Sequence, residues 1–327
     1  MSTLDIRRPA PAFAVSQDLV RLAYRLLAAG LICLALSLTT DAFLSFANII
    51  NVLRQASLLF FMASGLTLVI LTGGLDLSIG ANIALSACLA ATVMKATGSP
   101  WLGGLVGLGT GTLVGLVNGV LVTSLRIPAF IATYGTMWII HGLTYYYMAG
   151  ETIHGFPPEF RALGSGYLWG VPVPVFLMVV FLAIGSIFTQ RTTYGQQIYA
   201  IGANPVAAHL SGIPVMKRLV LVYAISGAMA GLASLVFLAR LNSAEGDIGD
   251  SLTLPAIAAA LIGGASLFGG VGTVSGTLIG ALILTLVLNG MNILGVSANW
   301  QPLVTGAIVI FAVWIDIKTG GRSSEKA

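Results

Sequence analysis

Long apolar runs follow one another along most of this chain, separated by short polar stretches. About ten of them approach or reach the ~20 residues that an α-helix needs to cross the hydrocarbon core of a bilayer. Inside that core every backbone N–H and C=O must be bonded within the protein, and an α-helix achieves this by itself. The sequence therefore predicts an all-α, polytopic membrane protein with about ten transmembrane helices. The predicted spans are Leu22–Leu38, Ile50–Leu71, Ile79–Met94, Leu102–Val122, Phe130–Met148, Val173–Phe188, Leu219–Leu238, Leu254–Leu267, Val274–Leu288 and Pro302–Ile315.

The proportion of charged residues excludes a soluble α-helical protein. Only 8% of the 327 residues are charged and 57% are hydrophobic, whereas soluble domains carry about 25% charged residues. The 40 glycines fit close packing of helices in lipid, where small residues let two backbones approach. We expect the first apolar run to be retained as a span, because no small-residue cleavage site follows it.

Basic residues indicate how the spans are oriented. Lysine and arginine favour cytoplasmic loops, and an even number of spans places both termini on one side. With both termini in the cytoplasm, 11 of the 15 basic residues fall inside and the other four outside. The predicted regions are a cytoplasmic N-terminus (1–20), a transmembrane domain (21–317) containing a cytoplasmic loop (190–218, here called the central loop), and a cytoplasmic C-terminus (318–327). The four outer basic residues are Arg54, Lys95, Arg161 and Arg240.

Two predicted outer loops, Ala149–Val171 and Leu241–Ser251, carry five of the 11 acidic residues. Loops of this kind fit solvated connections between spans. They fit equally a surface that meets an extracytoplasmic partner, and the sequence leaves both interpretations open.

The central loop contains the signals of a short helix. Asn204 is a good N-cap, because its side-chain oxygen accepts a backbone N–H that has no partner in the helix. Pro205 occupies the first helical position, where its missing N–H costs nothing. Gly212 suits the left-handed position after the helix, and Pro214 prevents continuation. The predicted helix, Pro205–Ser211, is about 10 Å long and too short to be stable alone, so we expect it to dock on a partner surface.

An acidic residue interrupts the apolar sequence at Leu71–Asn82, which reads LTGGLDLSIGAN. Since a charge in the bilayer core costs roughly 2.5–3.5 kcal/mol, Asp76 should face protein or water. We interpret Asp76 as the N-cap of the following helix, with Gly74 allowing the chain to bend. A place in the permeation path is the alternative. The pattern Leu-x-Gly-Gly-x-x-Leu-x-x-Gly recurs at Leu261–Gly270, which fits either a duplicated half or a chance match among glycine-rich spans.

A few other polar residues lie in or beside spans. They fit hydrogen bonds between helices, and equally contacts with a hydroxylated solute. The three histidines, His141, His154 and His209, are too isolated to predict a metal site. The candidate pathway or helix-break residues are Gly73, Gly74, Asp76, Ser78, Asn82, Asn118, Thr133, Asn289 and Asn292.

Several motifs are missing from the sequence. It contains no G-x-x-x-x-G-K-[ST] phosphate loop, nucleophile elbow, zinc motif or dinucleotide fingerprint, and no basic patch with interleaved aromatics that would bind nucleic acid. We therefore expect no enzyme, no metal and no cofactor on this chain. A secondary active carrier or facilitator for a small polar solute remains the alternative, although such a carrier usually buries several ionisable groups and Asp76 is a single one.

Five segments in order along the chain resemble the ribose-type sugar permeases of bacterial ABC importers, the inner-membrane components of binding-protein-dependent systems. The resemblance implies a permease subunit for a monosaccharide or related polyol in the bacterial inner membrane. It implies three partners: a cytoplasmic ATPase subunit that binds ATP and Mg, an external sugar-binding protein, and a second permease subunit that is identical or closely related. The segments are Thr72–Asn82, Ile127–Thr133, Tyr194–Val215, Ala239–Ala244 and Gly263–Ile283.

The resemblance also implies a role for the central loop. It makes Gly195–Ile213 the coupling loop that contacts the ATPase, which agrees with the docking helix predicted from capping residues. The coupling residues implied are Gly195, Asn204, Pro205, Ala207, His209, Ser211 and Gly212.

Overall fold

The computed structural model describes residues 17–324, and side chains from Ala23 to Lys318. The described residues leave out 1–16 of the predicted cytoplasmic N-terminus (1–20) and 325–327 of the predicted cytoplasmic C-terminus (318–327). The structure is helical apart from four two-residue strands among the residues described. The long helices are α1 (Gln17–Thr39), α2 (Phe46–Leu71), α3 (Ile79–Thr97), α4 (Pro100–Thr123), α5 (Ala129–Met148), α7 (Val173–Arg191), α10 (Val215–Leu241), α12 (Val274–Ile293) and α13 (Gln301–Ser324).

Shorter elements connect these helices. Strand β1 pairs with β4 and β2 with β3, both antiparallel. The short elements are β1 (Ile153–His154), α6 (Pro158–Ser165), β2 (Tyr167–Leu168), β3 (Val171–Pro172), α8 (Thr193–Ala203), α9 (Pro205–Leu210), β4 (Ser243–Ala244), η1 (Asp250–Leu252), α11 (Thr253–Ile262) and η2 (Ala298–Trp300).

Seven segments of the described chain are long and apolar enough to cross a membrane: α2, α3, α4, α7, α10, α12 and Ala298–Lys318. A polytopic all-α protein is thus confirmed, and the count of ten spans is not. The segment predicted as a span at Leu254–Leu267 differs most, because α11 ends at Ile262 after 10 residues. Such a helix is about 15 Å long, half the hydrocarbon thickness.

A glycine pair terminates α11. Gly264 adopts a left-handed φ of 87°, its N–H donates to Leu261 O, and Ala265 N–H donates to Ala260 O. These two bonds form a Schellman motif, which satisfies the last carbonyls of a helix. Hydropathy alone does not reveal this stop, because the residues beyond it remain apolar.

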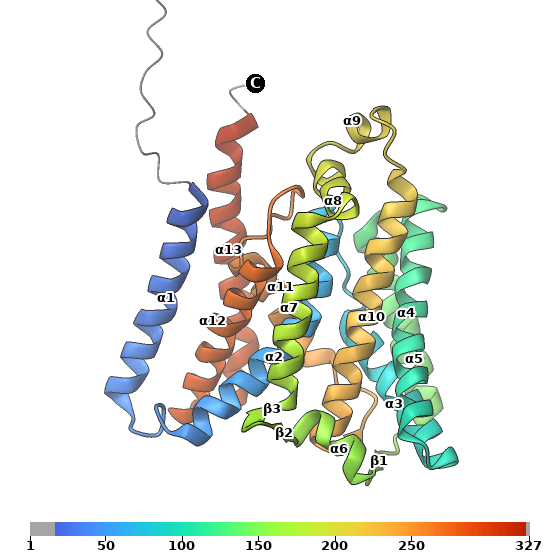
Figure 1. Cartoon of the computed structure of the whole chain (residues 1–327), viewed down its shortest axis with the longest axis vertical. Helices are drawn as coiled ribbons and strands as arrows, with labels where there is room; N and C mark the ends of the chain where they lie inside the picture. Colours follow the sequence, from blue (N-terminus) through green and yellow to red (C-terminus); the bar gives the residue numbers. More distant parts are fainter. Residues whose placement is uncertain (1–16, 325–327) are drawn as a thin grey trace, which may run out of the picture.

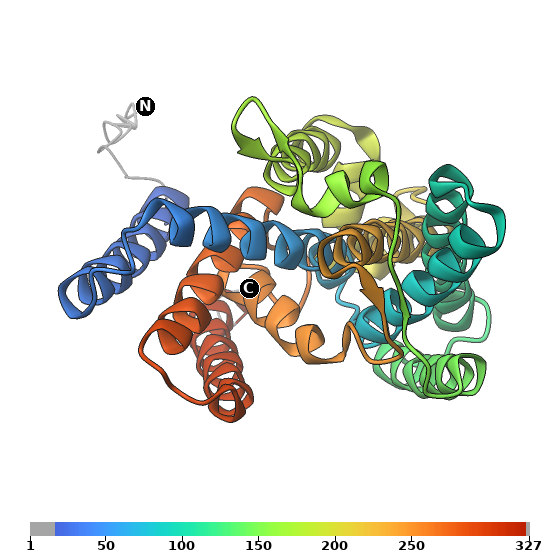
Figure 2. The ribbon, with the colours of Figure 1, turned by 90° about the horizontal axis from the view of Figure 1, so that it is seen from below.

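Helix α2 is the centre of the bundle. All its residues from Ala56 to Leu71 are buried, and Figure 2 shows it running through the middle of the molecule with helices on several sides. A helix that is apolar on all faces fits a position surrounded by other helices or by lipid, and the burial of α2 shows that other helices surround it.

Helices α4 and α10 meet backbone to backbone through glycines. A β-carbon on Gly111 would lie 2.5 Å from Gly227 O, and one on Gly115 would lie 2.2 Å from Tyr223 O. Neither position tolerates a side chain without separating the helices. The abundance of glycine therefore serves close helix packing, as the composition predicts.

The connections gather at two opposite ends of the bundle (Figure 1). The first described turn of α1, the helices α8 and α9, and the end of α13 lie at one end, whereas α6 and the strands lie at the other. The pairing of Ile153 with Ala244 joins the two predicted outer loops into one covering, and Lys95 Nζ donates to Gly155 O at 2.6 Å beside it. The predicted central and outer loops thus occupy opposite ends.

Candidate functional site

The predicted short helix of the central loop is present as α9, Pro205–Leu210. Asn204 has an extended backbone, and its Oδ1 accepts N–H bonds from Val206 and Ala207, both at 3.0 Å. Pro205 occupies the first helical position. The N-terminal end therefore forms as the capping residues predict.

The other end of α9 is a second Schellman motif. Gly212 has a φ of 82°, its N–H donates to His209 O, and Ile213 N–H donates to Ala208 O. The helix ends one residue earlier than predicted, because Ser211 is its C-cap. Gly212 thus has the predicted left-handed conformation.

Two apolar side chains on α9 are exposed. Val206 is 67% exposed and Leu210 81% exposed, four residues apart, while Ala208 is buried. Ala207 and His209 are also exposed. Residues four apart lie on one face of a helix, so α9 presents a small apolar face away from the bundle. The sequence analysis missed Val206 and Leu210, although their spacing in the predicted helix was a usable signal.

Helix α8 precedes α9 and was not predicted. Thr192 caps it, with Oγ1 accepting from Gly195 N–H at 3.1 Å. Gly195 is a contact point, since a β-carbon there would lie 2.3 Å from the carbonyl oxygen of Thr189. Arg218 of α10 binds α8 from the side: its guanidinium donates to Gln197 Oε1 and lies 4.1 Å from the centre of the Tyr194 ring. Helix α8 is therefore fixed to α7 and α10.

The last turn of α8 meets the loops that follow α2 and α11, at what we call the glycine junction: Leu71, Gly73, Gly202, Gly269 and Gly270. Leu71 O accepts Gly270 N–H at 2.9 Å. Gly202 lies against this bond, because a β-carbon there would be 1.8 Å from Leu71 O and 2.4 Å from Gly270 N. A β-carbon on Gly269 would lie 2.9 Å from both Gly202 O and Gly73 N. Three backbones therefore touch with no side chain between them.

Side chains hold the loop after α11 on two sides. Tyr199 of α8 donates its hydroxyl to Gly272 O at 2.7 Å, and burial raises the pKa of Tyr199, so the phenol keeps this proton. Asp316 of α13 accepts from Ser266 Oγ at 2.9 Å and from Leu267 N–H at 3.3 Å. A displacement of α8 must therefore move or break contacts of this loop.

The two copies of the Leu-x-Gly-Gly pattern meet at the glycine junction. Helix α2 ends in a Schellman motif in which Gly73, with a φ of 76°, donates to Ile70 O and Gly74 donates to Val69 O. In α11 the left-handed residue is Gly264, the second glycine of its pair. The ends of α2 and α11 thus share the Schellman motif, but the left-handed glycine is the first of the pair in α2 and the second in α11. A duplicated half remains a prediction.

The interpretation of Asp76 as the N-cap of α3 is wrong. Helix α3 begins at Ile79 with Ser78 as its cap residue, and Asp76 Oδ1 instead accepts from the N–H of Ser78 at 3.1 Å and from its Oγ at 2.7 Å. Its Oδ2 accepts from Ser226 Oγ of α10 at 3.0 Å. Gly74 does not provide the bend, which is at Gly73; a β-carbon on Gly74 would lie 2.8 Å from the Tyr223 hydroxyl.

Asp76, Ser78, Asn118 and Ser226 form one buried polar cluster, each at most 1% exposed. Asn118 Nδ2 donates to Ser78 Oγ at 2.7 Å, so the cluster joins α3, α4 and α10. Asn118 Oδ1 is buried and has no hydrogen-bond partner.

The remaining predicted pathway residues make separate contacts. Asn82 Nδ2 donates to Gly111 O at 3.1 Å, and Thr133 Oγ1 donates to Leu75 O at 3.2 Å. Asn289 exchanges two side-chain hydrogen bonds with Asn48, at 2.9 and 3.1 Å. Asn292 Oδ1 accepts from Gln301 Nε2 at 2.8 Å. In this conformation each of these four side chains links two parts of the bundle.

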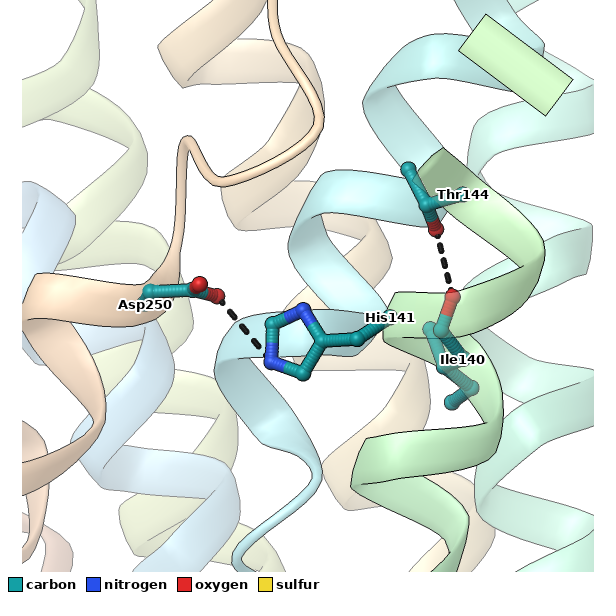
Figure 3. A network of polar contacts seen from close by, with 4 residues as sticks. All are labelled: Ile140, His141, Thr144 and Asp250. Atoms are coloured by element: carbon teal, nitrogen blue, oxygen red, sulfur yellow. Dashed lines mark hydrogen bonds and ion pairs between the residues drawn. The ribbon is translucent and has the colours of Figure 1, made fainter. Parts of the chain in front are cut away.

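No metal centre is visible in the described part of the chain, where no three His, Cys, Asp or Glu side chains are grouped closely enough to hold an ion. His141 lies 3.4 Å from Asp250 (Nε2 to Oδ1; Figure 3). His154 and His209 belong to the two opposite ends of the bundle.

Comparison with known proteins identifies the family. A family model described as the permease component of branched-chain amino acid transport systems matches residues 48–313. The chain belongs to this permease family. The match leaves out α1, which ends before residue 48, and the last turns of α13. It covers the other long helices almost completely. The permease is accordingly a transport component and not an enzyme.

Named relatives of the permease are similar over most of their length. The ribose import permease protein RbsC of Bacillus subtilis (strain 168) is 41% identical over 290 residues, 88% of this chain and 90% of that protein. RbsC of Escherichia coli (strain K12) is 42% identical, covering 84% and 87%. The galactose/methyl galactoside import permease protein MglC of E. coli (strain K12) is 34% identical, covering 88% and 91%. The resemblance to ribose-type permeases is confirmed. No solved structure matches the chain.

Proposed function

We propose that this permease is the membrane subunit of an ABC importer for a monosaccharide or related polyol. The family description names amino acid systems, but relatives 34–42% identical over most of their length carry the names of ribose and galactose importers. That likeness favours a sugar. A binding protein delivers the solute from outside, and an ATPase subunit acts from the cytoplasm.

The exposed apolar face of α9 carries the proposal. Val206 and Leu210 protrude from a helix whose two ends are capped, at the end of the bundle where α1 begins and α13 finishes. Six residues cannot hold a helix in water without a surface to dock on. The proposed partner is the cytoplasmic ATPase, so this end faces the cytoplasm of a bacterium and both termini are cytoplasmic.

Motion passes from α9 in two directions. When ATP binding closes the ATPase dimer, α9 moves with it and carries α8 along, because only Asn204 separates them. The movement of α8 then pushes Gly202 against the other residues of the glycine junction. This push displaces the ends of α2 and α11. Helix α10, which begins at Val215 after Pro214, carries the same motion to the opposite end of the bundle.

The proposed architecture completes ten crossing segments. Helices α1 and α5 add two full spans to the seven, and α11 with its following loop forms a half-crossing. A second permease subunit, the same chain or a close relative, completes the pathway. Gly195, Asn204, Pro205, Ala207, His209, Ser211 and Gly212 are proposed to couple to the ATPase.

Substitution of Ala207 tests the docking role. We expect Ala207→Glu to abolish ATP-driven uptake of labelled D-ribose or D-galactose by the reconstituted complex while the protein inserts normally, because a buried carboxylate at the interface has no partner. Ala207→Ser, a small polar change at the same position, should retain uptake. Full uptake by Ala207→Glu would refute docking, and gradient-driven flux through the chain alone would support a secondary carrier instead.

A further inference from the structure

Five rings form a row along α5, which we call the α5 ladder: Phe130, Tyr134, Trp138, His141 and Tyr145. Each ring contacts the next, with centroid distances of 5.9, 6.3, 5.8 and 6.2 Å. The row runs from Phe130 to Tyr145, 15 residue-to-residue steps along the helix or about 22 Å. It therefore runs most of the way from the end of the bundle near α9 to the opposite end.

Most of the ladder is uncovered in a single chain. Phe130, Tyr134, Trp138 and Tyr145 are between 44% and 59% exposed. Helix α5 packs mainly on α3 and α4, so much of its surface is left for something outside this chain.

The chemistry of the ladder argues against lipid as that occupant. His141 is paired with Asp250, whose side chain is 37% exposed (Figure 3). Asp250 lies at the end of the second predicted outer loop. This end reaches into the bundle, because a β-carbon on the neighbouring Gly249 would lie 2.2 Å from Gly80 O in the first turn of α3. A carboxylate facing acyl chains is strongly unfavourable, so charged groups within a membrane protein face protein or water. Asp250 begins η1, directly before α11, and Figure 2 shows α11 between α5 on one side and α12 and α13 on the other.

Hydrogen-bonding groups lie beside the flat apolar rings. His141 is 9% exposed, and its Nδ1 is buried with no hydrogen-bond partner. Tyr134 and Tyr145 carry hydroxyls and Trp138 an indole N–H, polar atoms on otherwise apolar side chains. A hydroxylated ring has matching features: an apolar C–H face that meets the negative face of an aromatic ring, and hydroxyls that meet the polar groups at its edge.

We propose that the α5 ladder contacts the transported solute directly, as a row of weak stacking positions for a hydroxylated ring, with His141 and Asp250 binding its hydroxyls. The inference rests on the proposed function and adds the surface along which the solute moves. Rings about 6 Å apart let a solute contact the next ring before it leaves the last. No position then binds tightly enough to retain it.

Trp138, in the middle of the ladder, is the position to test, with Ile139 as its matched control. Ile139 is 64% exposed on the same helix and at nearly the same height. In the reconstituted complex we expect Trp138→Ala to lower ATP-driven uptake of D-ribose or D-galactose by about fivefold or more, equivalent to about 1 kcal/mol. Trp138→Phe, which keeps a flat ring, should retain more uptake than Trp138→Ala, and Ile139→Ala should stay near wild type.

Protection from labelling tests contact with the solute independently of ATP. In a Cys33→Ser, Cys88→Ser background, saturating sugar should slow maleimide modification of a Tyr134→Cys variant and leave an Ile139→Cys variant unaffected. Equal uptake by Trp138→Ala and Ile139→Ala, or no protection at position 134, overturns the proposal. Loss of the assembled complex in Trp138→Ala also overturns it, because the ladder would then be an interface with the second subunit. ATP-independent uptake by the wild type would instead contradict the proposed function, with the labelling result still deciding the ladder.

Discussion

Gly202 is the position at which the smallest change should separate α8 from the membrane helices. In Gly202→Ala the new β-carbon would lie 1.8 Å from Leu71 O and 2.4 Å from Gly270 N. A carbon and a carbonyl oxygen approach no closer than about 3.3 Å, so α8 must move by about 1.5 Å. All the atoms it meets first belong to the backbone, and no side chain can rotate to relieve the clash.

The expected cost follows from the contacts that are lost. Overpacking costs about 1–3 kcal/mol, and losing the 2.9 Å bond from Gly270 N–H to Leu71 O costs about 1 kcal/mol more. Alanine is the better helix former by about 1 kcal/mol, which offsets part of this. A net destabilisation of about 1–3 kcal/mol remains, enough to open the junction without unfolding the bundle.

The assay compares uptake with ATP hydrolysis in the complete transporter. We expect Gly202→Ala to keep ATP hydrolysis while uptake falls about fivefold or more, because the lower end of this cost, about 1 kcal/mol, corresponds to a factor of about five. Gly109→Ala is the control, since no atom lies within 4 Å of a β-carbon there. Unchanged uptake and an unchanged thermal midpoint for Gly202→Ala would refute the tight junction and the transmission assigned to it.

Two further variants test the cap of α9 and the buried polar cluster. Asn204→Ala removes the acceptor of two N–H bonds and should destabilise α9 by about 1 kcal/mol, which we expect to weaken capture of the purified ATPase. Asn204→Ser, which keeps a capping oxygen, should retain most binding. Equal capture by the two variants would contradict the capping role. Asp76→Ala leaves the hydroxyls of Ser78 and Ser226 without their acceptor and should lower stability by about 1–3 kcal/mol in a thermal unfolding assay. Adding Ser226→Ala should then cost less than it does in the wild type; strictly additive losses would show that the two side chains are not coupled.

Local signals explain what could be predicted from the sequence. The cap at Asn204 and the left-handed Gly212 were predictable because each depends on the residue and its immediate neighbours. The same reasoning failed at Asp76, which has the composition of an N-cap but accepts a hydrogen bond from Ser226, 150 residues away. A contact across that separation leaves no trace in local spacing.

The glycine junction was beyond prediction for a related reason. Gly202 resembles any other glycine of a helical segment, and only the fold places Leu71 and Gly270 against it. Helix α8 was overlooked because the polar central loop has no apolar run to mark it. The class of polytopic all-α membrane protein could be predicted from composition and from the length of the apolar runs alone. Seven of the described segments are indeed long and apolar enough to cross a membrane.

The glycine contact between α4 and α10 has a mechanical consequence. Two helices that touch through their main chains have no side chains between them that could change rotamer and let one helix slide past the other. The contact between Gly111 and Gly227 therefore makes α4 and α10 move as one rigid unit. Helix α10 extends for 27 residues, about 40 Å. A tilt of the helix at Val215 therefore also displaces its other end at Leu241. Strand β4, which pairs with β1, follows at that far end, where the proposed external binding protein would meet the moving helix.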